Sequence, residues 1–329
     1  MSNILLAIPM LDKQSGDYLR NSLKKLGHNV ACFDWRNITN TVGVDRMNNA
    51  LISNIERLKP DITIIIKGLG ITAQTIRELK KIQSNPVVCW IFDVTLGGTY
   101  VKDAPQYIEV IKEYDTFYTM DNDAIEELKS LGVNAKYLTE GCYIPSHQQI
   151  SITDIQKQLY GSDVVFIGSV GMIHPNREKY LKAIYEAGFD LKIYGDIYYD
   201  KIPEWVNKCH TGKSVINDKH SLICQTANIV IGIDGWEHRS KSMSARIYRT
   251  MACGGFYLTT HTKDIDKVFK VGTQLDTYNN EEELVKKLDY WLEHDKERAK
   301  VAKVGQKKVL AEDTFEIRLK QILEENENE

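Results

Sequence analysis

Short apolar runs that alternate with amphipathic stretches constrain the fold of this chain more than any other feature. Residues 61–67 read Asp-Ile-Thr-Ile-Ile-Ile-Lys, a β-branched run that is apolar on both faces and typical of a central strand in a parallel sheet. Residues 15–26 place Leu19 and Leu23 on one helical face, the period of an amphipathic helix. The alternation continues along the chain and predicts doubly wound α/β sheets.

The expected elements form two series. In the first half, strands are expected over residues 3–8, 30–33, 61–67, 87–92 and 116–120, and helices over 15–26, 45–58, 72–82, 105–112 and 124–131. In the second half, strands are expected over 164–167, 191–194, 228–233 and 256–259, and helices over 176–187, 219–225, 244–252, 281–293, 296–310 and 314–326.

A polar stretch separates the two series, because the pattern lapses between residues 144 and 161. The length of 329 residues also favours two domains. We expect an N-terminal Rossmann-like domain over residues 1–150, a second over 151–310, and a helix over 311–329 that packs back on the first. Ligands of such sheets bind beyond the carboxyl ends of the strands, so sites are sought in the loops after strands, facing a cleft.

Composition excludes several classes of protein. A formal net charge of −3 provides no strong basic field for nucleic acid. No apolar run reaches the roughly 18 to 20 residues of a membrane helix, and residues 1–9 lack the basic start of a signal peptide. The six cysteines are scattered without C-x-x-C spacing, as expected of free thiols in a reducing, cytoplasmic compartment.

The most informative stretch is Ser242-Met-Ser-Ala-Arg-Ile-Tyr-Arg-Thr-Met-Ala-Cys-Gly-Gly255. It follows a predicted strand and becomes a helix near Ser244, and the unpaired N–H groups of a helix start suit a phosphate. Ser244 can cap this end or donate to a phosphate oxygen, while Arg246 and Arg249 oppose the helix dipole, a conflict that an anionic ligand resolves. The alternative is an ordinary capped helix with exposed arginines.

Two further stretches end strands in glycine. Val164-Val-Phe-Ile-Gly-Ser-Val-Gly171, followed by Arg177, lets backbone N–H groups approach a diphosphate, although it is no complete dinucleotide fingerprint. Leu191-Lys-Ile-Tyr-Gly-Asp196 places the ring of Tyr194 where it can stack beside a base, next to Gly195. The alternatives are a glycine-rich turn and a plain strand end.

These three stretches, in this order, resemble the C-terminal domain of GT-B glycosyltransferases. They are most similar to the CgeB-like branch, often labelled spore maturation proteins, in which an Arg-x-(Phe/Tyr)-Glu-x-x-Ala-x-Gly-Gly helix follows the two strand ends. That helix reads Arg246-Ile-Tyr-Arg-Thr-Met-Ala-Cys-Gly-Gly255 here. The likeness extends to the N-terminal half in Trp90-Ile-Phe-Asp93 and Tyr114-Asp-Thr-Phe-Tyr-Thr-Met-Asp121.

The resemblance implies transfer of a sugar from a nucleotide diphosphate sugar, UDP- or dTDP-linked, to a hydroxyl-bearing acceptor, without a bound metal. The donor-binding residues are then expected to be Gly168, Ser169, Arg177, Tyr194, Gly195, Ser244, Ala245, Arg246 and Arg249. A polysaccharide, a protein, a glycolipid or a modified nucleobase would each fit as acceptor. Asp93, after the strand at 87–92, is the candidate general base, with a turn cap as the alternative. Lys67-Gly68-x-Gly70 either touches a phosphate or makes a tight turn.

One departure from the family pattern concerns Arg249. The branch usually has a glutamate there that accepts hydrogen bonds from the donor ribose, and an arginine cannot accept. A non-catalytic nucleotide-sugar-binding protein of the same fold is therefore the main alternative, with a sugar-nucleotide epimerase or a solute-binding protein less favoured. Zinc ligation by Cys209, His210, His220 and Cys224 is not expected, because their spacing is irregular.

Overall fold

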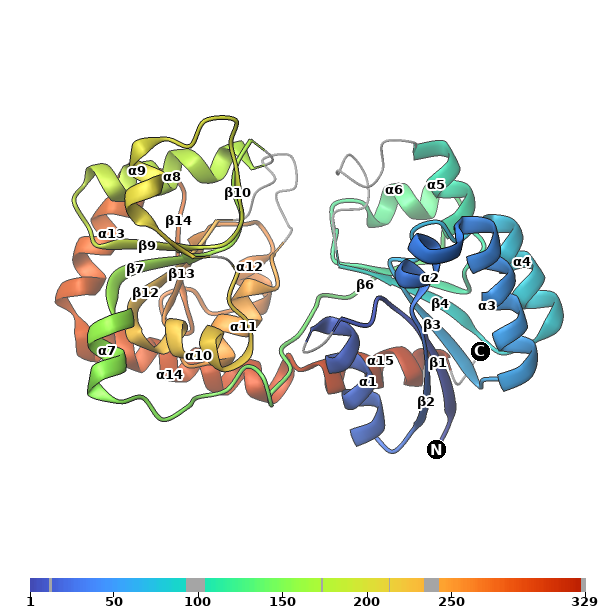
Figure 1. Cartoon of the computed structure of the whole chain (residues 1–329). Coiled ribbons are helices and arrows are strands. Elements are labelled where there is room, and N and C mark those ends of the chain that lie inside the picture. The colour runs from blue at the N-terminus through green and yellow to red at the C-terminus, as the bar shows by residue number, and fades with distance from the viewer. Residues whose placement is uncertain (12–13, 93–103, 173, 213, 234–242, 327–329) are drawn as a thin grey trace. The chain divides into compact units, whose positions relative to one another are not determined.

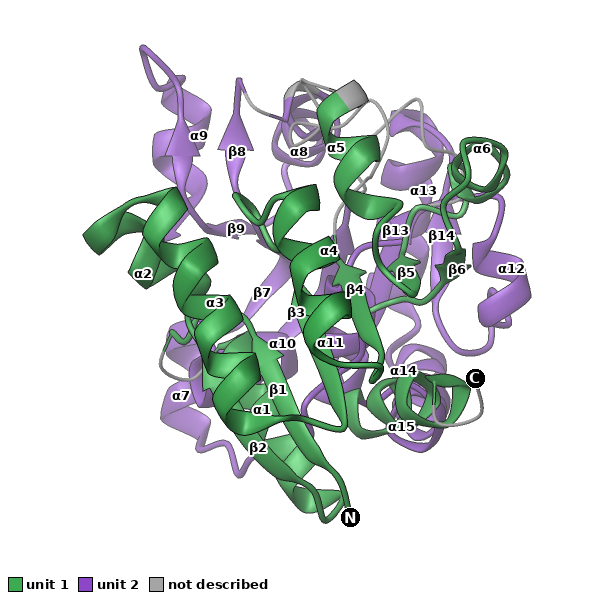
Figure 2. Cartoon of the chain, turned by 90° about the vertical axis from the view of Figure 1, so that its right-hand side faces the viewer, with its two compact units in different colours: residues 1–140, 315–329 green, residues 141–314 purple. Residues whose placement is uncertain are grey.

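The computed structural model describes residues 1–11, 14–92, 104–172, 174–212, 214–233 and 243–326. The chain divides into two compact units (Figure 2). Unit 1 consists of residues 1–140 and 315–329, and unit 2 of residues 141–314. The chain first passes from unit 1 to unit 2 after residue 140, ten residues before the expected domain boundary at 150.

Unit 1 is built on a six-stranded parallel sheet in the order β2-β1-β3-β4-β5-β6. The chain adds β2 on one side of β1 and then β3 on the other, so the direction of winding reverses between β1 and β3. The strands are β1 (Asn3–Ala7), β2 (Asn29–Phe33), β3 (Ile62–Ile66), β4 (Val87–Ile91), β5 (Thr116–Thr119) and β6 (Ala135–Tyr137).

Helices cover both faces of this sheet (Figure 1). One face packs in a core with residues of α3 (Val44–Leu58), α4 (Ala73–Ile82), α5 (Ala104–Ile111) and α6 (Ile125–Ser130). On the other face lie α1 (Ser15–Lys25) and the last helix, α15 (Phe315–Asn326), which contact each other. The ring of Phe315 lies 6.3 Å from that of Trp90 in β4, and Thr116 of β5 donates to Asn326. The short α2 (Trp35–Val42) packs on α3.

Unit 2 repeats this construction with the strand order β11-β9-β7-β12-β13-β14, again parallel throughout. Its winding reverses between β7 and β12. The strands are β7 (Ser162–Ile167), β9 (Leu191–Tyr194), β11 (His210–Gly212), β12 (Ala227–Gly232), β13 (Tyr257–Thr260) and β14 (Asp276–Tyr278), and β8 (Val170–Gly171) pairs with β10 (Ile197–Tyr198) outside the sheet.

Two apolar clusters cover the faces of the second sheet. The first holds residues of α8 (Pro175–Glu186), α9 (Glu204–Cys209) and α13 (Glu281–Glu293). The second holds residues of α10 (Asn217–Thr226), α11 (Arg246–Ala252) and α12 (Ile265–Val268). The long α14 (Asp295–Glu312) contributes Val301 to the first cluster and Val309 to the second. The exposed α7 (Asp154–Tyr160) packs on α10. The prediction of two doubly wound domains with C-terminal helices is confirmed.

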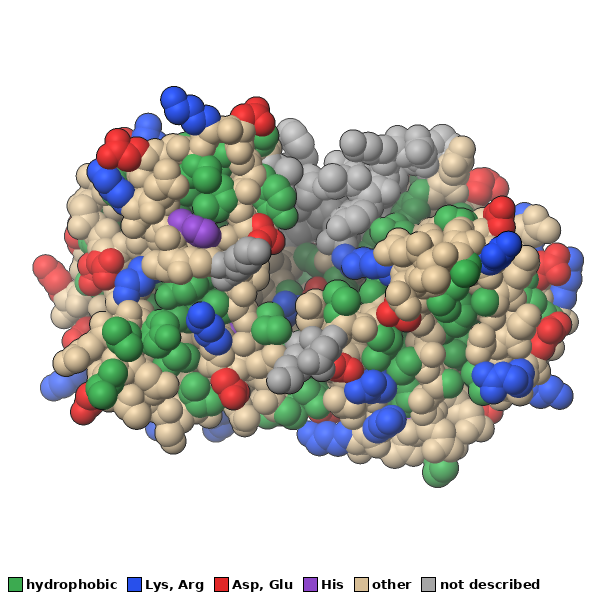
Figure 3. Space-filling model, in the orientation of Figure 1, with side chains coloured by type: hydrophobic (Ala, Val, Ile, Leu, Met, Phe, Trp, Pro, Cys, Tyr) green, Lys and Arg blue, Asp and Glu red, His purple; other side chains and the backbone are tan. Residues whose placement is uncertain are grey.

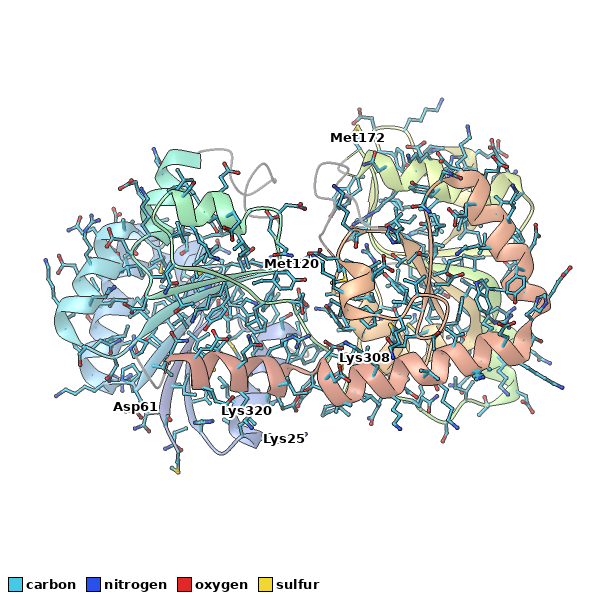
Figure 4. The ribbon with its side chains drawn as sticks, turned by 180° about the vertical axis from the view of Figure 1, so that it is seen from behind. Lys25, Asp61, Met120, Met172, Lys308 and Lys320 are labelled. Carbon is cyan, nitrogen blue, oxygen red and sulfur yellow. The ribbon has the colours of Figure 1, made fainter. Side chains whose placement is uncertain are left out.

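The two connections between the units run side by side. The backbone N–H of Cys142, just after the first crossing, donates to the carbonyl of Asp313, just before the second, at 2.9 Å. Lys308, near the end of α14, pairs with Asp313, and Lys320 lies further along on α15 (Figure 4). Acidic and basic side chains are interspersed on the visible face of each unit (Figure 3). None of the described helices is long and apolar enough to cross a membrane.

Candidate functional site

The ends of β7 and β9 meet through two glycines. The N–H of Gly168 donates to the carbonyl of Tyr194 at 2.8 Å, and the N–H of Gly195 donates to Gly212 at 3.0 Å. A Cβ on Gly195 would lie 2.1 Å from the carbonyl oxygen of Gly168, so only glycine allows this approach. These backbone turns lie at the carboxyl edge of the sheet, beside the point where its winding reverses.

Two arginines converge on the Gly168 turn from different helices. The guanidinium carbons of Arg177 and Arg246 lie 5.7 and 5.4 Å from the centre of the Phe166 ring. Nη1 of Arg246 lies 3.1 Å from the place that a Cβ on Gly168 would take. Both cations therefore flank one buried aromatic ring beside the turn.

Backbone carbonyls hold these guanidinium groups in place. Nη1 of Arg177, in the first turn of α8, donates to the carbonyl of Ser169 at 2.8 Å. Nη2 of Arg246, the first residue of α11, donates to the carbonyl of Ile233 at 2.9 Å, directly after β12. Arg177 is buried and Arg246 is half-buried. The structure thus brings together residues that lie 69 positions apart in the sequence.

Burial and the two arginines together lower the pKa of His174, which lies beside the turn. Burial first, and then the charges of Arg177 and Arg246, lower the pKa of His174 to about 4. The imidazole is therefore neutral at physiological pH, and the charge near the turn comes from the arginines. Arginine side chains gathered at one turn attract anions.

The start of α11 differs from the prediction at Ser244. The helix begins at Arg246 with Ala245 as its N-cap, and no side chain caps it. The hydroxyl of Ser244 is buried and makes no hydrogen bond to any described residue. The predicted cap is therefore wrong, because Ser244 lies one residue before the position from which it could cap. The amide of Ile247 instead bonds to the Ser244 carbonyl at 3.2 Å.

Arg249 and Tyr194 take places that the sequence did not suggest. The charge of Arg249 reaches His147, whose pKa is lowered first by burial and then by this arginine. Tyr194 is 4% exposed and packs in the apolar cluster around α11, so its ring has no open stacking face. Its contribution to the turn is the backbone carbonyl that accepts from Gly168.

Unit 1 has a cavity of ≈ 210 Å³ at the carboxyl ends of β1, β3 and β4. Its charged lining residues are Arg36, Lys67 and Glu140. The cavity lies where the winding of this sheet reverses, the equivalent position to the Gly168 turn in unit 2. Arg36 and Glu140 were not predicted from the sequence, because neither belongs to a glycine-rich strand end.

Lys67, the middle residue of a tight turn at this cavity, has a strained backbone. The N–H of Gly68 bonds to the carbonyl of Ile66 at 2.8 Å, and Lys67 adopts φ 63. A left-handed conformation is costly for lysine, and such strain is concentrated at functional sites. The predicted base Asp93 follows Phe92 of the cavity wall and lies outside the described residues.

Comparison with known proteins agrees with this architecture. Residues 177–324 match a family described as glycosyl transferase-like. No curated protein matches the chain by sequence. Among solved structures, HepE from Anabaena in complex with UDP-glucose has a TM-score of 0.71 at 11% identity, covering 100% of both chains.

Two other solved structures have the same fold. The sucrose-phosphate synthase of Thermosynechococcus elongatus has a TM-score of 0.71 at 10% identity over 99% of both chains. A glycosyltransferase from Rickettsia africae has 0.67 at 14% identity over 99% of this chain and 98% of that one. The matched C-terminal sequence and the fold of the whole chain together identify this protein as a glycosyltransferase of the GT-B fold.

Proposed function

We propose that unit 2 binds a nucleotide diphosphate sugar with its diphosphate at the Gly168 turn, between Arg177 and Arg246. The observation that carries this proposal is the convergence of the two guanidinium groups on the Phe166 ring. Guanidinium groups suit phosphate because their planar N–H forks match its oxygens. The low pKa of His174 supports the same conclusion, since an anion at this turn would offset the field of the arginines.

The same groups would stabilise the leaving diphosphate during sugar transfer. Negative charge develops on the diphosphate as the bond to the sugar breaks, and two fixed cations in a buried site meet that charge. The hydroxyl of Ser244 and the backbone amides around Ala245 would add hydrogen bonds. Because protein groups supply this positive charge, the transfer is proposed to be independent of metal.

The nucleoside would lie along the Gly195 turn, beside the proposed position of the diphosphate. HepE, of the same fold, was solved with UDP-glucose, which favours a uridine nucleotide, with dTDP as the second candidate. Membership of the CgeB-like branch remains part of this proposal. Arg249 replaces the glutamate of that branch and is proposed to approach the donor from the second turn of α11.

The acceptor is proposed to bind in the cavity of unit 1. Arg36, Lys67 and Glu140 offer both signs of charge for hydroxyl-rich or anionic acceptors. Asp93 is proposed as the base that takes the proton of the acceptor hydroxyl, because it directly follows the cavity residue Phe92.

A thermal-shift screen with UDP, dTDP, GDP and CMP tests the donor proposal. A ligand that binds only the folded state raises the melting temperature in proportion to its affinity. We expect UDP or dTDP to stabilise the protein most, and an equal absence of stabilisation by all four would contradict the proposal.

Slow hydrolysis of the matching nucleotide sugar then tests catalysis. The same measurement after a brief addition of chelator tests whether catalysis is independent of metal. Tight nucleotide binding without hydrolysis or transfer would favour the non-catalytic alternative that Arg249 raises.

A further inference from the structure

A cluster of three metal-binding side chains is buried in unit 2, on the sheet face that carries α10 and α11. His220 and Cys224 lie one turn apart on α10, so their side chains share one face of the helix. Cys253 is the C-cap residue of α11. All three side chains are buried, with exposed fractions of 6%, 0% and 0%.

The distances between the three side chains are those of ligands around one ion. Nδ1 of His220 lies 3.7 Å from Sγ of Cys224 and 3.6 Å from Sγ of Cys253. The ligand atoms all lie within 4.8 Å of one another. A tetrahedral Zn²⁺ with Zn–S bonds of about 2.3 Å and Zn–N bonds of about 2.0 Å separates its sulfur and nitrogen ligands by roughly 3.5 Å. Nε2 of His220 also lies 3.8 Å from Sγ of Cys224, so the imidazole has to turn before one nitrogen and both sulfurs can close on zinc.

Neighbouring hydroxyl groups complete the surroundings of the sulfurs. Oγ of Ser221 lies 3.3 Å from Sγ of Cys253, and Oγ1 of Thr250 lies 4.0 Å from Sγ of Cys224. Hydroxyl groups at these distances orient thiolate ligands and tune them. An ion held by these three side chains would have a fourth position for an oxygen ligand, either the Ser221 hydroxyl or a water.

The adjacent histidine is not a ligand. The ring of His147 lies 5.7 Å from that of His220, but its Nδ1 accepts a hydrogen bond from the backbone N–H of Tyr143. The proton of the neutral ring is therefore on Nε2, and neither nitrogen retains a lone pair for a metal.

The geometry points to a Zn²⁺ site formed by His220, Cys224 and Cys253. Binding displaces the two thiol protons to solvent, and the two thiolates then cancel the charge of the ion, so the buried site is neutral overall. A monovalent copper ion in the same place would leave a net negative charge in the core, which favours zinc. The site would fasten α10 to α11, the helix that presents Arg246, and it does not depend on which donor binds.

This set of ligands differs from the one considered in the sequence. Cys209 packs in the opposite apolar cluster, and His210 bonds to the carbonyl of Gly195, so neither belongs to the site. Cys253 takes their place, although it lies 29 positions after Cys224 in the sequence.

Metal analysis of the purified full-length chain tests the site. We expect one zinc per chain after dialysis, and at least a tenfold loss of zinc affinity in Cys224→Ser and in Cys253→Ser. Cys209→Ser is the matched control, because it also removes a buried thiol from unit 2 but should keep one zinc per chain.

Addition of Co²⁺ to the reduced, metal-free wild-type chain provides a readout that does not require the variants to fold. Thiolate-to-cobalt charge-transfer bands and intense visible bands are expected, along with a higher melting temperature on addition of Zn²⁺. A chain that purifies without zinc, shows no thiolate bands with Co²⁺ and melts unchanged with Zn²⁺ would overturn the site in favour of an ordinary hydrogen-bonded cluster.

Discussion

The carbonyl oxygen of Gly168 lies 2.1 Å from the point where a side chain at Gly195 would begin. This close contact holds the end of β7 against the end of β9 and fixes the conformation of the Gly168 turn. Substitutions at this contact therefore test the geometry of the proposed donor site before any ligand is known.

Gly195→Ala is expected to destabilise the protein by about 1–3 kcal/mol and to weaken nucleotide binding, because the new methyl group forces the two turns apart. Gly212→Ala is the matched control, since Gly212 has φ 155, against φ 157 at Gly195, but no atom within 4 Å of a built Cβ. Urea melts and nucleotide titrations of both variants distinguish the effect of the clash with Gly168, which only Gly195→Ala introduces, from the effect of backbone strain, which both variants share. Equal effects would mean that the contact is unimportant.

Arg246→Ala is expected to weaken nucleotide diphosphate binding by about 1.5–3 kcal/mol, roughly 10- to 150-fold, the scale of a charge-assisted hydrogen bond. The control is Arg57→Ala, which removes an exposed arginine that donates locally to Asn54. Isothermal titration with UDP and dTDP measures the difference. Unchanged affinity in Arg246→Ala would remove this residue from the donor site.

His174 provides a spectroscopic reporter of anion binding. Its pKa of about 4 should rise when a diphosphate binds, because the anion offsets the charges of Arg177 and Arg246. Titration of the imidazole by NMR, with and without nucleotide, measures the shift, and His174→Gln assigns the resonance. An identical titration in both states would place the anion elsewhere.

The low pKa of His174 also predicts how the free energy of unfolding depends on pH. The unfolded chain takes up a proton near pH 6.5, whereas folded His174 resists protonation until about pH 4. The free energy of unfolding should therefore fall as the pH drops from 6.5 to 4, with buried His147 acting in the same direction. Urea melts over this range should show a shallower fall in His174→Gln.

Phe315→Ala is expected to cost about 3–5 kcal/mol, the usual loss for a fully buried aromatic side chain. The ring packs against Trp90 and Tyr18 of unit 1, so the loss should appear in the unfolding of that unit. Ile155→Ala, at a position that is 69% exposed, should change stability by less than about 0.5 kcal/mol. A similar effect of both substitutions would contradict the packing of α15.

Elements with a strong apolar period were predictable from the sequence. The strand at Leu191–Tyr194 and the helix at Glu281–Glu293 have the predicted bounds. By contrast, α7 was missed, because none of its residues is buried and its polar sequence is like that of a linker. Its start is nevertheless marked by a capping box between Thr153 and Gln156, a local pattern that could have revealed it.

The candidate site could be predicted in part for a similar reason. The glycine-rich strand ends and the arginines were visible in the sequence, but only the fold brings Arg177 and Arg246 to one aromatic ring. Likewise, the approach of Cys253 to His220 depends on the packing of α10 against α11. The spacing of residues along the chain does not reveal such contacts between distant segments.

The passage of the chain through α14 before α15 has a consequence for biosynthesis. The first sheet emerges from the ribosome before the second, yet α15, which covers one of its faces, is translated only after the whole of unit 2. Unit 2, continuous from residue 141 to 314, can fold while the N-terminal sheet still exposes the apolar surface that Phe315 will cover. The N-terminal unit therefore has to wait until α15 has been made, and a truncation before Phe315 would damage the half of the protein that was made first.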